Sequence, residues 1–210
     1  WQLIFKTFAL LAIGSTLFSL LVAFYIYDLS DLYRLNWLDP FSGQAHLLNI
    51  HAGFDELSPL LRQKFPKTRL TIFDFYDPLK HTEVSIKRAR RAYPPDPNNI
   101  AVATTQLPLA NDSVDRIFLV LAAHEIRDSQ ERDHFFQEIY RILHPTGQIV
   151  FVEHLRDGAN FLAFNWGFLH FHSKKTWTRA IAQAHLLIRS EQKITPFIHV
   201  FTLTKDGNTS

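Results

Sequence analysis

The sequence contains no cysteine and no methionine. The lack of cysteine excludes disulfide bonds and thiolate metal sites, and it suits a reducing compartment. Glycine is also scarce, with 7 residues in 210, so each glycine at a turn is informative. The net charge is only +2, which does not favour a general nucleic-acid binder, and we expect no nucleic-acid partner.

The length and composition favour one globular domain with an extension. Of the 210 residues, 47% are apolar and 20% are charged, so a sizeable core can form. No internal repeat is visible. Because the sequence begins at Trp1, we expect a fragment or a processed product.

A long hydrophobic run, residues 7–27, carries no charged side chain. A helix of this length spans about 30 Å, the thickness of the hydrocarbon core of a bilayer. Tyr25 and Tyr27 stand at its end, where membrane proteins have an aromatic belt. We therefore predict a membrane anchor or a membrane-associated helix. The alternative is a hydrophobic helix that packs on its own domain.

The following residues, 28–38, predict a short amphipathic linker helix that begins at Asp28 and carries a leucine stripe. Asp39-Pro40 and Ser42-Gly43 are expected to end it. The predicted organisation is an N-terminal hydrophobic helix with its linker over 1–38, a globular domain over 39–204 and a flexible tail over 205–210.

The segment from His46 to Glu56 organises the rest of the chain. It predicts a buried strand that stops at a turn containing Gly53, and helical spacing begins at Ser58. A second apolar run, residues 69–74, ends in the carboxylate of Asp74. A strand, a glycine turn, a helix and a strand that ends in an acid form the layout of a βαβ unit that holds a nucleoside.

Strands and helices alternate along the remaining chain. We expect further strands over 100–103, 114–121, 148–154, 188–194 and 197–204, helices over 83–92, 132–143 and 174–187, and a turn at 145–147. The predicted fold is α/β: a Rossmann-like, doubly wound sheet of seven mostly parallel strands with an antiparallel terminal strand, plus the N-terminal hydrophobic helix. The basic run at 87–91 is either a solvated helix face or a contact with anionic headgroups.

Two later motifs carry the most specific signal. Residues 107–115 read LPLANDSVD, and the AHE of 123–125 is followed by EIYRILHPTG at 138–147 and by VEH at 152–154. These are similar to the LPFxDxSFD loop and the LHH…EIxRVLKPGG segment of a known family. From His46 to Thr204 the chain resembles a class I S-adenosylmethionine-dependent methyltransferase of the small quinone- and lipid-modifying kind (methyltransferase type 11).

The resemblance implies that S-adenosylmethionine is the cofactor. It places the turn 51–55 against the methionine part of that molecule, Asp74 at the ribose hydroxyls, and residues 104–107 beside the adenine. Residues 121–125 would line the floor near the sulfonium and the acceptor. The implied cofactor-binding residues are Asn49, His51, Ala52, Gly53, Asp55, Asp74, Phe75, Thr105, Gln106, Leu107 and Leu121.

The chain departs from the family pattern at this turn. The family has an acid followed by G-x-G-x-G, whereas this chain has Asn49, then His51, Gly53 and Asp55, and it has Ala103 in place of an adenine-edge aspartate. A Cβ at 51 and 55 restricts positive φ, and Asn49 removes a charge that would help to hold the cofactor's amino group.

Two histidines at strand ends are candidate catalytic bases. His124 and His154 follow strands at the carboxyl edge, where open α/β sheets bind ligands. A base is needed only if the acceptor is a phenol, an amine or an acidic carbon. The alternative for each is a packing or hydrogen-bonding role, and Glu153 is more typical of a structural acid.

An aromatic segment over 160–172 follows the fifth strand. In the resembling family this region covers the substrate, so His124, Trp166, Phe168 and His170 are candidate acceptor-binding residues; core packing or contact with a membrane surface is the alternative. His170 and His172 form an H-x-H pair without a third ligand, so we expect no metal.

The leading hypothesis is methyl transfer from S-adenosylmethionine to a lipophilic phenol, quinone or lipid-like acceptor at a membrane. The catalytic domain would face the cytoplasm, where the donor is made. The alternative is a non-catalytic relative with a degenerate cofactor site that binds a lipid or a protein partner. An NAD-dependent oxidoreductase is disfavoured because G-x-G-x-x-G and its context are missing.

Overall fold

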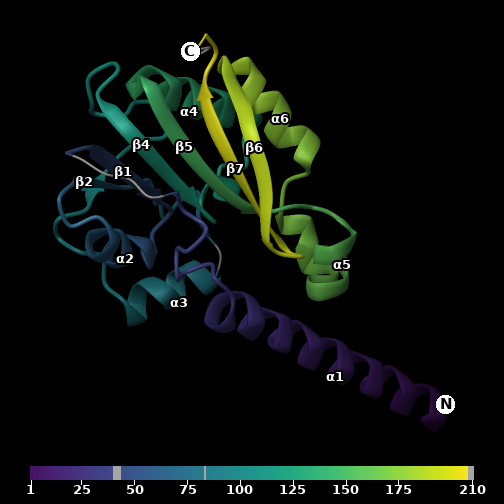
Figure 1. Ribbon diagram of the computed structural model, residues 1–210. Coiled ribbons are helices and arrows are strands. Elements are labelled where there is room, and N and C mark those ends of the chain that lie inside the picture. The colour runs from purple at the N-terminus through teal and green to yellow at the C-terminus, as the bar shows by residue number, and fades with distance from the viewer. Residues whose placement is uncertain (40–43, 83, 208–210) are drawn as a thin grey trace.

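The computed structural model covers residues 1–210 and describes all of them except 40–43, 83 and 208–210 (Figure 1). The expected break at Pro40, Ser42 and Gly43 lies outside the described residues. The described chain forms a single seven-stranded sheet with helices on both faces and a long N-terminal helix, α1 (Gln2–Phe24), that projects from the body.

The sheet has the strand order β3-β2-β1-β4-β5-β7-β6. Its strands are β1 (His46–His51), β2 (Arg69–Asp74), β3 (Ile100–Ala101), β4 (Val114–Val120), β5 (Leu143–His154), β6 (Leu186–Thr195) and β7 (Ile198–Lys205). The first five pair in parallel, and β7 runs antiparallel between β5 and β6. The predicted fold class is therefore confirmed: β7, the last strand, is the antiparallel one, and β6 forms the edge.

Alternating side chains divide the strands between two cores. On β4, Ile117 and Leu119 join one core, whereas Phe118 points into the other. The first core is closed by α4 (Ser129–Ile142) and α6 (Lys174–Gln183), and the second by α2 (Leu57–Lys64), α5 (Gly158–Phe164) and the segment that follows α1. The remaining helix, α3 (Val84–Ala92), lies near the carboxyl ends of β1 and β2.

The segment after α1 differs from the predicted linker helix. A π-helical turn, Tyr25–Leu29, extends α1 and contains Asp28, and residues 30–38 then form turns. Leu35 has φ +56°, which ends helical continuation. The leucines at 32, 35 and 38 are nevertheless buried in the second core, so the apolar pattern was correct and the backbone assignment was wrong.

Other boundaries also shift. α4 begins at Ser129, three residues earlier than expected, because the Asp128 side chain accepts a hydrogen bond from Glu131 N. The predicted turn at 145–147 instead lies inside β5, where the pairing jumps from Val114↔Leu143 to Arg116↔Gln148.

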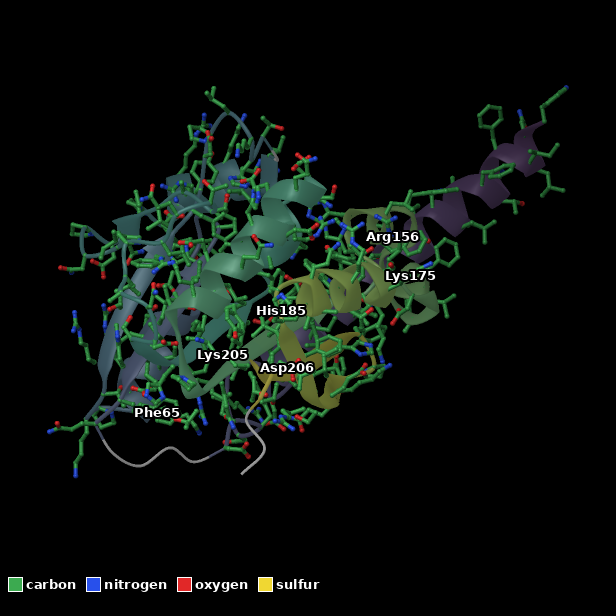
Figure 2. The ribbon with its side chains drawn as sticks, turned by 90° about the horizontal axis from the view of Figure 1, so that it is seen from above. Phe65, Arg156, Lys175, His185, Lys205 and Asp206 are labelled. Atoms are coloured by element: carbon green, nitrogen blue, oxygen red, sulfur yellow. The ribbon has the colours of Figure 1, made fainter. Side chains whose placement is uncertain are left out.

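Near the other end of the chain α6 stops at Gln183, earlier than the predicted end at residue 187. His185 follows with φ +57°, and its carbonyl accepts a hydrogen bond from Asp206 N (Figure 2). β6 then begins at Leu186. β7 includes Lys205, one residue beyond the predicted domain end.

Candidate active site

A cavity of about 300 Å³ opens at the carboxyl ends of β1, β4 and β5. Its wall includes Asn49, His51 and Asp55 around the first turn, Leu121, His124 and Glu125 after β4, His154 and Phe171 beyond β5, and Tyr27 and Tyr33 from the N-terminal segment. This is the edge at which open α/β sheets bind ligands. Sequence reasoning placed most of these residues here but missed both tyrosines.

The turn after β1 depends on Gly53. Its φ of +96° is a conformation that L side chains rarely adopt, and an added Cβ would lie 2.9 Å from Tyr76 and 3.0 Å from Arg90. The predicted glycine turn is therefore present.

Asn49 and Asp55, two departures from the family pattern, bind each other. Asn49 Nδ2 donates to Asp55 Oδ1 at 3.0 Å and to Ser58 Oγ at 2.9 Å. The same carboxylate oxygen accepts from the backbone amides of Leu57 and Ser58 at the start of α2. Asp55 thus anchors the helix N-terminus, and an amide at position 49 pairs with it where a second carboxylate would repel it.

His51 is a neutral member of this turn. Its Nδ1 accepts from Gly53 N at 3.2 Å and lies 3.8 Å from Asp74 Oδ1. Burial lowers the pKa of His51, and the nearby carboxylates only partly oppose that effect. A neutral ring at this position adds shape and hydrogen bonds to the site rather than charge.

Asp74 stands beside His51 in the sheet register and is held by a residue that sequence reasoning did not place in the site. Arg90, on α3, donates from Nη1 to Asp74 Oδ2 at 2.7 Å and to Gly53 O at 3.0 Å. Its guanidinium lies 4.2 Å from the ring centroid of Tyr76, and Tyr76 N donates to Asp74 Oδ1. The basic run on α3 was interpreted only as a surface feature.

His124 is clamped by two glutamates. Its Nδ1 lies 2.8 Å from Glu153 Oε2, its backbone N donates to Glu153 Oε1, and its Nε2 lies 3.4 Å from Glu125 Oε1. Burial alone would lower the pKa of His124, but the two carboxylates outweigh burial and raise that pKa to about 10. The raised pKa favours the imidazolium form, which donates hydrogen bonds from both ring nitrogens; the role of His124 as a base stays a prediction.

Glu125 also faces a second histidine. Its Oε1 lies 3.4 Å from His170 Nε2, and the ring centroids of His124 and His170 are 5.1 Å apart. Burial would raise the pKa of Glu125, but hydrogen bonds from the two histidines hold that pKa well below its usual range. Arg127 contacts the ring of His170 through Nη2, which lies 2.9 Å from Nε2.

His154 has the opposite character to His124. Its Nδ1 lies 3.1 Å from both Asn160 Oδ1 and Phe197 O, so Nδ1 carries the proton and Nε2 accepts from Tyr27 OH at 3.0 Å. Burial lowers the pKa of His154 to about 4. The ring is neutral at physiological pH, and its accepting nitrogen is already bound to Tyr27.

Comparison with known proteins gives one family-model match and a set of structural neighbours. Residues 52–151 match the family model described as methyltransferase domain, and no curated protein matches the chain. Among solved structures, an S-adenosylmethionine-dependent methyltransferase from Aquifex aeolicus is 14% identical with a TM-score of 0.63, over 85% of this chain and 92% of that one. Residues 52–151 thus match a methyltransferase domain, and the chain has the fold of this S-adenosylmethionine-dependent methyltransferase.

Two further structural neighbours act on small molecules. Geranyl diphosphate C-methyltransferase from Streptomyces coelicolor is 12% identical with a TM-score of 0.54, over 77% of this chain and 72% of that one. Human N-acetylserotonin methyltransferase is 15% identical with a TM-score of 0.54, over 76% of this chain and 47% of that one. At these identities both show the shared fold.

Parts of the site fit S-adenosylmethionine. Gly53 keeps the backbone of the turn free of a Cβ, and Asp74 offers carboxylate oxygens to ribose hydroxyls, each oxygen with a lone pair beyond its present bond. Arg90 already occupies one side of that carboxylate, so a bound ribose must share Asp74 with it or displace it.

The predicted adenine-side residues do not line the cavity. Phe75 is buried against Phe135, Leu107 is buried, and Gln106 bridges back to Ala103. Leu107 is held through its backbone N, which donates to Glu138 Oε2. The cofactor roles of these residues and of Thr105 remain predictions.

The residues of the aromatic segment 160–172 lie in different environments. Trp166 is 78% exposed and Phe168 packs on Phe161, so neither lines the cavity, and their acceptor-binding role stays a prediction. His172 turns away to Arg132 and Trp177. In contrast, Phe171 lines the cavity and stacks on His154 with 4.6 Å between the ring centroids.

Proposed function

We propose that this methyltransferase methylates a lipophilic small molecule, a phenol, quinone or lipid-like acceptor, at a membrane surface, with its catalytic domain on the cytoplasmic side. The observation that carries the proposal is the bond between Tyr27 and His154. Tyr27 lies in the turn that continues α1, and His154 ends β5 in the cavity wall. The apolar helix therefore leads directly to the cavity.

The helix suits a bilayer. The span Gln2–Leu29 is long and apolar enough to cross a membrane, and its large side chains are mostly exposed, standing clear of the body (Figure 2). The proposed insertion would cover this surface, which otherwise faces water at a considerable free-energy cost.

A second apolar surface continues that of α1. Phe161, Leu162, Trp166 and Leu169 are exposed on α5 and the 3₁₀ turn after it. This element is tied to α1 because Ser19 Oγ donates to Ala163 O at 2.6 Å and Asn165 Nδ2 donates to Ser15 Oγ at 2.8 Å. For the exposed residues of the aromatic segment, this attachment to α1 supports contact with a membrane surface, the alternative to covering the substrate.

The cavity favours an apolar acceptor. Val120, Leu121, Phe54 and Phe171 contribute much of its wall, and its volume of about 300 Å³ is at the small end of ligand pockets. The similarity to an enzyme named for geranyl diphosphate, a molecule with an apolar chain, is in keeping with this class of acceptor.

When bound, S-adenosylmethionine supplies a methyl group activated by a sulfonium. The chain's own task is to align the acceptor, exclude water and stabilise charge on the acceptor atom. His124 serves as a hydrogen-bond donor to a phenolate or enolate oxygen, since its ring is held protonated by Glu153 and Glu125. Tyr27 offers a hydroxyl next to the same cavity.

The cofactor and membrane parts are tested separately. Isothermal titration with S-adenosylhomocysteine should give saturable binding; no binding at millimolar ligand would overturn catalysis and support the non-catalytic alternative.

Flotation with anionic vesicles tests the membrane part. Leu17→Arg should lower the bound fraction at least tenfold because an arginine at mid-helix costs about 3 kcal/mol.

The matched control for flotation is Leu79→Arg, which changes an 88% exposed leucine outside α1 and should float like the parent. Equal flotation of Leu17→Arg and Leu79→Arg would overturn the anchor. For the acceptor, transfer of labelled methyl to phenols of graded chain length should rise with partitioning into the vesicles, and a preference for water-soluble phenols would contradict the proposal.

A further inference from the structure

We propose that His124, Glu125 and His170 bind one divalent transition-metal ion of the zinc class in the wall of the active-site cavity. Among the described residues, these three side chains present ligand atoms that all lie within 4.8 Å of one another. They come from the 3₁₀ turn after β4 and from the 3₁₀ turn before α6. Sequence reasoning considered only the H-x-H pair of His170 and His172 as possible ligands. The fold instead brings His170 to His124 and Glu125.

The spacing matches tetrahedral coordination. Zinc bonds to histidine nitrogen and carboxylate oxygen are about 2.0–2.1 Å long, which places neighbouring tetrahedral ligands about 3.3–3.4 Å apart. Glu125 Oε1 lies 3.4 Å from His124 Nε2 and 3.4 Å from His170 Nε2. Two of the three ligand separations thus have the tetrahedral value, and the third, between the two histidines, is at most 4.8 Å.

The outer contacts also suit a metal ligand. A ligating histidine commonly donates its other ring nitrogen to a carboxylate, which fixes the ring orientation. His124 does so through Nδ1 to Glu153, which is fully buried. The ion would take the place of the proton that Glu153 and Glu125 hold on His124, and the two carboxylates would then stabilise a divalent cation.

Two histidines and one carboxylate leave an open coordination position. Such three-ligand sets are typical of catalytic zinc, whereas structural zinc has four protein ligands. His124 and Glu125 line the cavity, so the open position would take the hydroxyl of the acceptor and lower its pKa, with the proton released to water. In the metal-bound protein the ion would replace the His124 N–H as the group that stabilises the acceptor oxygen. This role of the ion rests on the proposed function; the binding of the ion does not.

Arg127 is the competing cation. Its Nη2 lies 2.9 Å from His170 Nε2 and also contacts Nδ1, so its guanidinium must move when the ion binds. We therefore expect Arg127→Gln to tighten metal binding several-fold, whereas a structural role for the histidine cluster predicts no metal-dependent change.

The experiment measures Zn²⁺ binding by competition with a chromophoric chelator, on the full chain and without cofactor. The parent should bind one equivalent of Zn²⁺. His170→Gln and Glu125→Gln should each weaken binding at least 100-fold, and Glu153→Gln about 10–100-fold through loss of ring orientation. Mg²⁺, which prefers octahedral oxygen ligands, should not compete. Substitution with Co²⁺ should give the visible absorption of a tetrahedral site.

His172→Gln is the matched control, two residues from His170 but facing Arg132 and Trp177, and it should bind Zn²⁺ like the parent. Circular dichroism melting confirms that each variant is folded. Absence of stoichiometric Zn²⁺ binding by the parent, or equal weakening by His170→Gln and His172→Gln, would overturn the site. Binding of S-adenosylhomocysteine by the same metal-free samples separates this outcome from failure of the proposed function.

Discussion

Arg90 Nη1 donates to Asp74 Oδ2 at 2.7 Å, so a cation of the chain is bound to the carboxylate assigned to the ribose of the cofactor. Asp74 is only 7% exposed, and Arg90 also binds the carbonyl of Gly53. Arg90, on α3, thereby joins the glycine turn after β1 to the carboxylate at the end of β2. A ligand that reaches Asp74 must share the carboxylate with Arg90 or displace it.

Arg90→Gln should tighten the binding of S-adenosylhomocysteine by about three- to tenfold, or roughly 1 kcal/mol, because a competing cation is removed from Asp74. Asp74→Asn should weaken binding at least tenfold. Titration calorimetry measures both, and Arg91→Gln, an exposed neighbour on the same helix, is the control. Weaker binding by Arg90→Gln would show instead that the arginine contacts the cofactor.

Asn49→Asp should destabilise the protein by about 1–3 kcal/mol, because two carboxylates would then face each other across the present 3.0 Å contact with Asp55 in a mostly buried setting. Urea unfolding measures the loss. The exchanged double variant Asn49→Asp/Asp55→Asn restores an amide–carboxylate pair and should recover most of the stability, as a double-mutant cycle would show. Additive losses in the cycle would contradict this pairing.

The sequence was sufficient for the sheet and for the centre of the site because both depend on local patterns. The central strands were visible as apolar runs, and Gly53 and Asp74 could be placed because they follow or end two of these runs. The position of β7 between β5 and β6 could not be predicted. Two strands joined as an antiparallel hairpin give the same sequence pattern whichever of them pairs with β5.

The contacts that define the site chemistry join distant parts of the chain and could not be predicted from spacing. Tyr27 and His154 are separated by 127 positions, and both had a different role in the sequence interpretation. The pairing of Glu125 with His170 depends on a 3₁₀ turn that has no periodic signal. His124 was expected to be a base, and only its two carboxylate neighbours show that its pKa is raised.

Gly53→Ala should destabilise the protein by about 1–3 kcal/mol and abolish measurable cofactor binding. A side chain at φ +96° is strained, and its Cβ would push on Tyr76 and Arg90. Chemical unfolding and calorimetry provide the two measurements. Gly158→Ala is the control because a Cβ there meets no atom within 4 Å; an equal loss in both variants would mean that the turn geometry is not the cause.

The stability of the protein should fall as the pH is lowered from about 6.5 to 4. Burial lowers the pKa of His154 in the folded state from 6.5 to about 4, so over this window the unfolded chain binds the proton and the folded chain does not. The loss from this residue reaches at most about 3 kcal/mol and levels off below pH 4. His172, with its pKa lowered to about 4 by burial and nearby arginines, adds a smaller loss. Urea unfolding at pH 7 and pH 4.5 measures this loss. The free energy of unfolding should differ less between the two pH values in His154→Gln than in the parent. The variant should also be less stable at pH 7, because it loses the ring stacking on Phe171. His134→Gln, at an exposed position on α4, should keep the parent's pH dependence. An unchanged pH dependence in His154→Gln would mean that His154 is accessible to protons in the folded state, and the closed contact with Tyr27 would then be wrong.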